Sequence, residues 1–372
     1  MNIFPPAGLY IHVPFCMSKC RYCDFYSFPS DGGLFEPYTE RVTNALEHYR
    51  NRYARRYNSL YFGGGTPLLL GEKQLIKITE KALYLMEEDS EITAEGNPAA
   101  AGALDFAALR AAGINRLSLG LQSSDERELS ALGRRHSPKD AAETVSAAQR
   151  AGFDNISLDL MLGVPYQTEK SLLESIDFCA SLGVQHISAY MLKIEEGTPL
   201  ASSELRFLCA DEEKSANLYL LACGELERRG FRQYEISNFA KPGFESRHNL
   251  KYWLDGEYLG IGPSAHSFME GRRFYFERDI ASFMEKPFEE LEREEAFGGG
   301  WEEYAMLRLR LREGLDTAEL ARLFPGAPAK DILRRAALYA GHGLLEINGE
   351  KISFTPRGFL LSNALTAELL YE

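Results

Sequence analysis

Three cysteines near the start of the chain have the residue type and the spacing of a metal site. Cys16, Cys20 and Cys23 follow one another as C-x3-C-x2-C in an aromatic segment. A structural zinc site takes four ligands, usually from paired C-x2-C units, and a ferredoxin run supplies a fourth cysteine nearby. No fourth cysteine follows closely here, so three thiolates on a [4Fe-4S] cluster leave one iron without a protein ligand. An open coordination position favours chemistry at the metal.

Two other interpretations of these cysteines remain open. They could be unrelated thiols in a loop, or they could form a zinc site that His12 completes. Short cysteine spacings of this kind usually indicate a metal, which favours the cluster. Three further cysteines, Cys179, Cys209 and Cys223, are scattered along the chain, and we expect them to be buried free thiols.

Composition indicates an ordinary soluble globular protein. The 372 residues are 45% hydrophobic and 26% charged, which allows one large domain and a smaller one. No apolar run approaches the roughly 18 residues of a membrane span, and the first six residues lack the basic region of a signal peptide. We therefore expect a cytoplasmic protein, in a compartment that keeps thiols reduced. The net charge of −13 argues against nucleic acid as a partner.

Short β-rich runs alternate with helical patterns over most of the chain. Strands are expected at residues 9–13, 59–62, 92–95, 116–121, 156–160 and 186–191. Helices are expected at residues 36–57, 72–86, 105–112, 139–151, 169–182 and 211–229. Such alternation predicts a parallel sheet. Six units of this kind predict an α/β fold, a partial (β/α)6 barrel.

Polar or glycine-rich segments follow the predicted strands, where barrels of this kind carry their chemistry. The cysteine segment follows the first strand, and Gly63-Gly64-Gly65-Thr66 follows the second. Later strands end near Glu95, Gln122, Asp159 and Tyr190. One residue of this kind could be a cap or a satisfied core group. Together, at one end of one sheet, they predict the rim of a pocket.

The cysteine motif, with the Tyr-x-His-x-Pro-Phe strand before it, resembles the radical S-adenosylmethionine (SAM) superfamily. Within that superfamily the chain resembles the oxygen-independent coproporphyrinogen III oxidases and their HemW-type heme-chaperone relatives, over nearly its whole length. The resemblance implies a radical SAM barrel, a [4Fe-4S] cluster on the three cysteines, and S-adenosyl-L-methionine on the open iron. It also implies one-electron chemistry, in which the reduced cluster cleaves SAM to methionine and a 5′-deoxyadenosyl radical.

The resemblance also implies which residues bind SAM. The turn of Gly64, Gly65 and Thr66 resembles the segment that binds the methionine amino group. Tyr10 matches a position that touches the ligand. Further positions match residues that contact the ribose and the carboxylate of SAM, namely Glu95, Gln122, Arg134 and Asp159. The residue types suit these roles, because carboxylates accept hydrogen bonds from ribose hydroxyls and an arginine can pair with a carboxylate as a fork.

Two features bear on which relative the chain resembles more. The oxidases typically carry another cysteine two residues after the third, where this chain has Phe25, and they have a longer N-terminal extension. The segment from His248 to Tyr252 and Trp253 matches the His-Asn-x-x-Tyr-Trp signature of the HemW-type proteins. Imidazole is a good axial ligand of heme iron and aromatic rings suit a flat macrocycle, so this motif is a candidate heme site. His266, in another family-like motif, is a second candidate, and a purely structural role of His248 stays open.

These features favour a heme chaperone that binds heme and transfers it to apo-hemoproteins, including membrane-bound respiratory ones. Such partners would bring the protein to the membrane surface as a peripheral component. The alternative is an oxygen-independent coproporphyrinogen III dehydrogenase of porphyrin biosynthesis, which converts two propionates of a porphyrinogen to vinyl groups. Whether the protein acts as an enzyme, and in which oligomeric state, stays open at this point.

The domain organisation expected from the sequence has three parts. Residues 1–235 form the barrel, residues 236–300 an extension with the His-Asn-x-x-Tyr-Trp motif, and residues 301–372 a small winged-helix-like domain. The last part reads as three helices and a hairpin with an Asn-Gly turn. Such modules often bind DNA. However, Arg334 and Arg335 are the only basic pair on the expected recognition helix, residues 331–339, so we expect this domain to cap the barrel or dock a partner.

Overall fold

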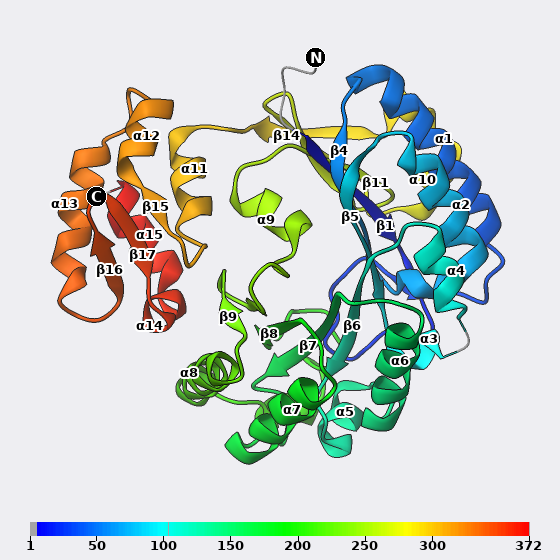
Figure 1. The fold of residues 1–372 in the computed structure, drawn as a ribbon, viewed down its shortest axis with the longest axis horizontal. Coiled ribbons are helices and arrows are strands. Elements are labelled where there is room, and N and C mark those ends of the chain that lie inside the picture. Colours follow the sequence, from blue (N-terminus) through cyan, green and yellow to red (C-terminus); the bar gives the residue numbers. More distant parts are fainter. Residues whose placement is uncertain (1–5, 103, 372) are drawn as a thin grey trace.

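The computed structural model describes residues 6–102 and 104–371. Its centre is one 12-stranded sheet, in which six parallel strands lie side by side in chain order (Figure 1). These strands are β1 (Ala7–Val13), β4 (Tyr57–Gly64), β5 (Met86–Gly96), β6 (Arg116–Gln122), β7 (Ile156–Leu162) and β8 (His186–Met191). The predicted α/β fold, a curved sheet of six parallel strands with a C-terminal domain, is confirmed. Residues 1–5, on which part of the signal-peptide argument rests, lie outside the described residues.

Helices cover the outer face of the curved sheet (Figure 1). Those found near their predicted positions are α1 (Phe35–Tyr53), α2 (Glu72–Leu83), α4 (Phe106–Ala111), α6 (Pro138–Arg150), α7 (Glu169–Ser181) and α8 (Glu212–Arg228). The short helices α3 (Pro98–Ala101) and α5 (Glu126–Leu132) were not predicted. The expected end of the first helix at residue 57 was wrong. Ala54 turns into the left-handed region at φ 46° and ends α1, and Tyr57 already belongs to β4.

The alternation along β1 separates the hydrophobic core from the inside of the barrel. Leu9 and Ile11 are fully buried beneath the outer helices. Tyr10 and His12 point to the other face, because successive side chains of a strand alternate. In the register with β4, Tyr10 lies opposite Tyr61. The inner face of the barrel is therefore lined by aromatic and polar side chains.

The strands between residues 232 and 297 continue the same sheet at both of its edges. At the β8 edge lie β9 (Arg232–Gln233) and β10 (Asn238–Ala240), both antiparallel. At the other edge β11 (Tyr258–Ile261) pairs parallel to β1, as a seventh parallel strand that was not predicted because it is short and contains a glycine. The antiparallel strands β12 (His266–Met269), β13 (Arg272–Phe276) and β14 (Glu292–Phe297) follow it. Two helices, α9 (Arg247–Trp253) and α10 (Ile280–Glu285), connect these strands.

The C-terminal part has its own three-stranded sheet in the order β15-β17-β16. Its elements are α11 (Trp301–Arg308), β15 (Leu315–Asp316), α12 (Thr317–Leu323), α13 (Ala329–Ala340), β16 (Leu345–Asn348), β17 (Lys351–Phe354), α14 (Pro356–Leu360) and α15 (Ser362–Tyr371). The order up to β17 is that of a winged helix, and α14 and α15 extend it. α9 lies between this part and the barrel, where α11 contacts it (Figure 1).

The basic pair on α13 is already engaged within the domain. Arg335 Nη1 donates to the Leu369 carbonyl at 2.7 Å, and Arg334 Nη2 lies 3.1 Å from Asp331 Oδ1. Arg335 thus links α13 to α15, and Arg334 is paired with an acidic residue of its own helix. The two arginines therefore do not form a free cationic patch. No helix in the described ranges is long and apolar enough to cross a membrane.

Candidate functional site

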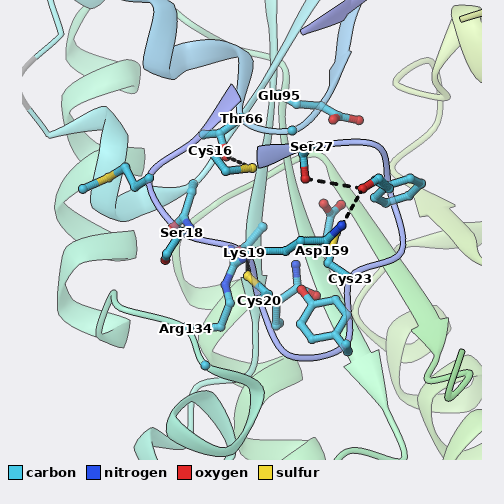
Figure 2. Close-up of a pocket in the computed structure, with 18 of the residues that line it drawn as sticks. Cys16, Ser18, Lys19, Cys20, Cys23, Ser27, Thr66, Glu95, Arg134 and Asp159 are labelled. Atoms are coloured by element: carbon cyan, nitrogen blue, oxygen red, sulfur yellow. Dashed lines mark hydrogen bonds between the residues drawn. The ribbon is translucent and has the colours of Figure 1, made fainter. Parts of the chain in front are cut away.

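A cavity of about 470 Å³ opens at the C-terminal ends of the parallel strands, and the three cysteines line it (Figure 2). The structure also brings to this cavity nearly all the residues expected at SAM, namely Gly64, Gly65, Thr66, Glu95, Gln122, Arg134 and Asp159. Tyr10 is not among the lining residues. Its ring lies behind the cavity, inside the barrel.

The cysteine loop is closed at its base by a two-stranded pairing. Cys16 ends β2 (Phe15–Cys16), which pairs with β3 (Phe28–Pro29) after the loop has returned. Two donors reach the cysteine sulfurs from other elements (Figure 2). Thr66 Oγ1 lies 3.6 Å from Cys16 Sγ, and Arg134 Nη1 lies 3.4 Å from Cys20 Sγ. Donors to cluster sulfurs raise the potential of an iron–sulfur centre.

His12 is not placed to complete a zinc site. Its Nε2 donates to the Tyr26 carbonyl at 2.8 Å, so Nδ1 is the acceptor for the Tyr10 hydroxyl at 3.1 Å. Burial lowers the pKa of His12 to about 4, against an opposing hydrogen bond to Tyr26. Both ring nitrogens are therefore used inside the protein. Within the described residues no three His, Cys, Asp or Glu side chains lie close enough to hold one metal ion, so the fit to a cluster rests on the thiols that surround the wider cavity.

The glycines after β4 fasten the strand end to the cysteine loop. Gly65 N donates to the Val13 carbonyl and Thr66 N to the Phe15 carbonyl, both at 2.8 Å. A Cβ on Gly65 would lie 2.6 Å from the Phe15 oxygen, and one on Gly64 would meet the His12 ring at 2.8 Å. Larger residues would push the loop away from the strand. The triple glycine thus sets the position of the cysteine loop over the barrel.

Arg134 lines the cavity and carries a buried, unpaired donor. Its Nη2 donates to the Gly120 carbonyl and its Nη1 faces Cys20. Its Nε is buried and has no hydrogen-bond partner among the described groups. A buried unpaired donor is costly unless a ligand or water satisfies it. This donor set fits an anionic group such as the carboxylate of SAM.

Two carboxyl groups face the same cavity. Burial raises the pKa of Glu95 to about 7, the hydrogen bond from the Tyr61 hydroxyl at 2.7 Å opposes the rise, and nearby Asp159 adds to it. Burial also raises the pKa of Asp159, and Ser118 Oγ lies 3.5 Å from its Oδ1. Both carboxyls have acceptor capacity left for ligand hydroxyls. Shifted carboxyls in a cleft of this kind are common at functional sites.

His248 lies deep inside the barrel with both ring nitrogens in use. Its Nδ1 is 2.9 Å from Ser59 Oγ, its Nε2 is 2.9 Å from the Tyr252 hydroxyl, and the side chain is 1% exposed. Burial lowers its pKa to about 3. The ring stacks on Tyr61 at 5.1 Å and on Tyr10 at 6.3 Å. This geometry agrees with the structural interpretation of His248 and does not favour an axial heme ligand.

The other heme candidates lie in different places. The Tyr252 hydroxyl is hydrogen-bonded to His248. The guanidinium carbon of Arg310 lies over the Trp253 ring, 4.6 Å from the ring centre. His266 begins β12, which is separated from β1 by β11, and its side chain is 55% exposed to solvent, whereas His248 is buried inside the barrel. The structure therefore does not bring His248 and His266 into one site.

Several interior residues were missed by the sequence reasoning. Glu91 accepts hydrogen bonds from Arg247 N at 3.1 Å and His248 N at 3.0 Å, and so seats the start of α9. Arg116 is 1% exposed, with Nε and Nη1 unpartnered among the described atoms. A charged residue at the start of an otherwise apolar strand is the signal that could have identified Arg116, whereas Glu91 lies among other charged residues in the middle of β5 and gives no such signal.

Comparison with known proteins agrees with this geometry. The Radical SAM superfamily model matches residues 10–179, and the HemN C-terminal domain model matches residues 300–361. A heme chaperone HemW of Mycobacterium tuberculosis is 35% identical over 98% of this chain and 95% of its own. The heme chaperone HemW of Bacillus subtilis is 34% identical over 98% and 99%, and that of Escherichia coli is 34% identical over 77% and 81%.

Among solved structures, coproporphyrinogen III oxidase (HemN) from Escherichia coli superposes with a TM-score of 0.84. It is 20% identical and covers 99% of this chain and 91% of its own, so it shares the fold. The cysteine loop, the cavity at the strand ends and the full-length similarity lead to one assignment: this chain belongs to the radical SAM superfamily and, within it, to the HemW family.

Proposed function

We propose that this protein is a heme chaperone, which binds heme and transfers it to apo-hemoproteins. The observation that carries the proposal is the similarity to heme chaperones along the whole chain, with a cavity that retains the expected cysteine and polar residues. Recipients among membrane-bound respiratory proteins would bring this protein to the membrane surface.

The cavity is the proposed site of the resident cofactors. Cys16, Cys20 and Cys23 would hold the [4Fe-4S] cluster, and Arg134 would pair its free Nε with the carboxylate of SAM. Glu95 and Asp159 would accept hydrogen bonds from the ribose, with Gly64, Gly65, Thr66, Gln122 and Tyr10 around the remaining ligand. When bound, the two cofactors supply one-electron chemistry. The protein itself orients the ligand, donates to two cysteine sulfurs and raises the pKa of Glu95 to about 7 through burial.

The His-Asn-x-x-Tyr-Trp motif is proposed to support the cavity from inside the barrel. His248 stacks on Tyr61, and the Tyr61 hydroxyl donates to Glu95. On the other side of the imidazole, the Tyr252 hydroxyl is hydrogen-bonded to Nε2 of His248. The motif thereby holds one carboxyl of the cavity wall in place.

The alternative function is coproporphyrinogen III dehydrogenation, which the shared fold with the oxidase keeps under consideration. Phe25, which stands where the oxidases carry a further cysteine, is 68% exposed at the rim of the cavity. An exposed apolar ring at that position suits contact with a flat macrocycle better than ligation of a metal.

Reconstitution of the cluster followed by two assays tests the proposal. The anaerobic protein is given SAM, a reductant and coproporphyrinogen III, and is separately titrated with hemin. We expect saturable hemin binding and no protoporphyrinogen. Product that forms with the native protein and is lost in Cys20→Ala would establish the dehydrogenase instead. Absence of both hemin binding and product would exclude both functions.

A further inference from the structure

The histidines of this chain differ sharply in what they can still bind. All seven are described, and four of them use both ring nitrogens in hydrogen bonds: His12, His136, His186 and His248. His48 is largely buried, and its Nε2 is enclosed. Only His266 and His342 therefore present an accessible ring to solvent.

His266 is oriented by its neighbours in a way that His342 is not. Its ring stacks on Tyr275 at 5.3 Å with an interplanar angle of 23°. Its Nδ1 lies 3.5 Å from Glu295 Oε2, while Nε2 has no partner among the residues that the structure describes. A metal-binding histidine commonly offers one nitrogen to the metal while a carboxylate holds the other, which fixes the ring and strengthens the ligand.

The ring stands in a second surface cavity of about 510 Å³, which Tyr275, Arg278 and Glu295 also line. This volume lies within the roughly 300–1,000 Å³ typical of small-molecule sites. Another acidic residue at its edge, Glu294, pairs with Arg272 at 3.3 Å. Its charge is therefore partly compensated by a neighbour outside the cavity.

This second cavity adjoins the cysteine loop. Arg278 Nη2 donates to the Asp24 carbonyl, and Lys19 Nζ donates to the Phe25 carbonyl at 3.2 Å. Arg278 Nη2 also lies 3.9 Å from Asp24 Oδ1. Two exposed cations thus contact the backbone at Asp24 and Phe25, and the ring of Phe25 is itself exposed. Arg278 and His266 lie close enough to His12 to lower its pKa, after the larger effect of burial. His12 in turn is hydrogen-bonded through Nε2 to the Tyr26 carbonyl of the cysteine loop.

The glycines before His266 fix its place relative to the loop. A Cβ on Gly262 would lie 2.6 Å from the His12 oxygen, and one on Gly260 would lie 2.2 Å from the His266 oxygen. The turn between β11 and β12 therefore lies directly against β1, the strand that leads into the cysteines. His266 and the loop are positioned by the same strand.

We propose that His266, through Nε2, is the axial protein ligand of the heme iron, with Glu295 behind it. The macrocycle would extend from Tyr275 toward Phe25, and its two propionates would meet Arg278 and Lys19. The inference rests on the proposed heme-chaperone function and replaces His248 as the ligand. It places the cargo beside the cysteine loop, so that heme and cluster share one face of the protein.

Hemin titration of the full-length, cluster-bearing protein under anaerobic conditions tests the ligand. His266→Gly should lower hemin affinity at least about tenfold and remove the spectrum of imidazole-ligated heme. Added imidazole should restore that spectrum in the variant. His342→Ala is the matched control, because it removes the other exposed histidine, and it should leave binding unchanged. Glu295→Gln should retain heme with a raised reduction potential, since the ligand loses its carboxylate partner.

The outcomes separate this inference from the function on which it rests. If native protein binds heme and His266→Gly binds it with the same spectrum, His266 is not the ligand but the chaperone function stands. If native protein binds no heme, both are wrong. A second readout compares hemin with its dimethyl ester. Arg278→Ala should weaken binding of hemin severalfold and leave the ester unaffected, and an equal effect on both would contradict the proposed propionate contact.

Discussion

At the scale of single residues, Arg134 connects the cysteine loop to the barrel wall. One side chain faces Cys20, bonds to Gly120 and keeps its Nε for a ligand. A guanidinium can do this because its donors form a rigid fork, which the ammonium group of lysine does not provide. The charge of the residue alone is therefore not enough for the role that we assign to it.

Arg134→Lys should weaken SAM binding by about 10- to 100-fold, the range expected for loss of a charge-assisted hydrogen bond. Iron and sulfide content should stay near that of the native protein, because the three cysteines remain. Calorimetric titration of the reconstituted protein with SAM measures the effect. Arg150→Lys, at an exposed position of α6 outside the cavity, is the control. Equal SAM affinity of native protein and Arg134→Lys would show that the fork does not bind the ligand.

Glu95 makes the stability of the cofactor-free protein depend on pH. Its pKa rises from 4.5 to about 7 on folding. Between these values the unfolded chain has lost the proton and the native state keeps it, so the free energy of unfolding falls as pH rises through this window. The full shift corresponds to about 3 kcal/mol, and we expect about 1–2 kcal/mol because the carboxyl faces a cavity.

Glu95→Gln removes this titration. Urea unfolding of the cofactor-free native protein and the variant at several pH values from about 5 to 8 gives the comparison. The variant should gain stability relative to the native protein as pH rises, mostly between about pH 5 and 7. Parallel stability profiles would mean that Glu95 titrates normally in the folded state.

The residues at the strand ends could be predicted from sequence, and the residues inside the barrel could not. Glu95 stands directly after a β-rich run and the cysteines form a motif, so position and residue type identify them, while Arg134 was expected through the family resemblance. The role of His248 depends on Ser59 and Tyr252, which reach it only in the folded barrel. A motif match identifies a histidine that has a particular role, but it does not show which groups the two ring nitrogens contact.

At the scale of elements, α9 shows how a short helix depends on a distant strand. Glu91 of β5 accepts from the first two backbone amides of α9, and Ser246 caps the same end. The guanidinium of Arg116 lies near the Glu91 carboxylate. A buried arginine of this kind needs a compensating charge nearby. The carboxylate therefore serves both the helix and the cation.

Glu91→Gln should lower the free energy of unfolding by about 2–4 kcal/mol, since it leaves the buried cation uncompensated and weakens the seat of α9. Chemical denaturation measures the loss. Glu88→Gln, at an exposed position of the same strand, should change stability by less than about 0.5 kcal/mol. Similar stabilities of the two variants would show that Glu91 does not anchor the helix.

Elements with strong periodicity were predictable, while short ones depended on tertiary contacts. The long outer helices follow apolar patterns that sequence reveals. α5 was missed although Asp125 caps it and Gly133 ends it, because only seven residues separate these signals. β11 has four residues and pairs with β1 at the start of the chain, a contact that no local pattern encodes.

At the scale of the whole molecule, one sheet joins regions that the sequence divides. Strands on both sides of residue 235 belong to this sheet. β11 pairs with β1, the strand that leads into the cysteines, and so places the turn before His266 against β1. The C-terminal part is attached through the Glu235–Leu311 bridge and the bond from Arg312 N to the Tyr234 carbonyl at 2.9 Å. The proposed cargo site and cofactor site therefore lie on a common framework.

Heme delivery tests the chaperone function most directly. Heme-loaded, cluster-bearing protein is mixed anaerobically with membranes from heme-deficient cells, and the heme recovered in membrane hemoproteins is measured over time. Albumin carrying the same amount of heme serves as the passive donor. We predict that the membrane apo-hemoproteins acquire heme faster and more completely from this protein than from albumin. Equal rates from the two donors would contradict the account, because heme would then reach its recipients by simple dissociation.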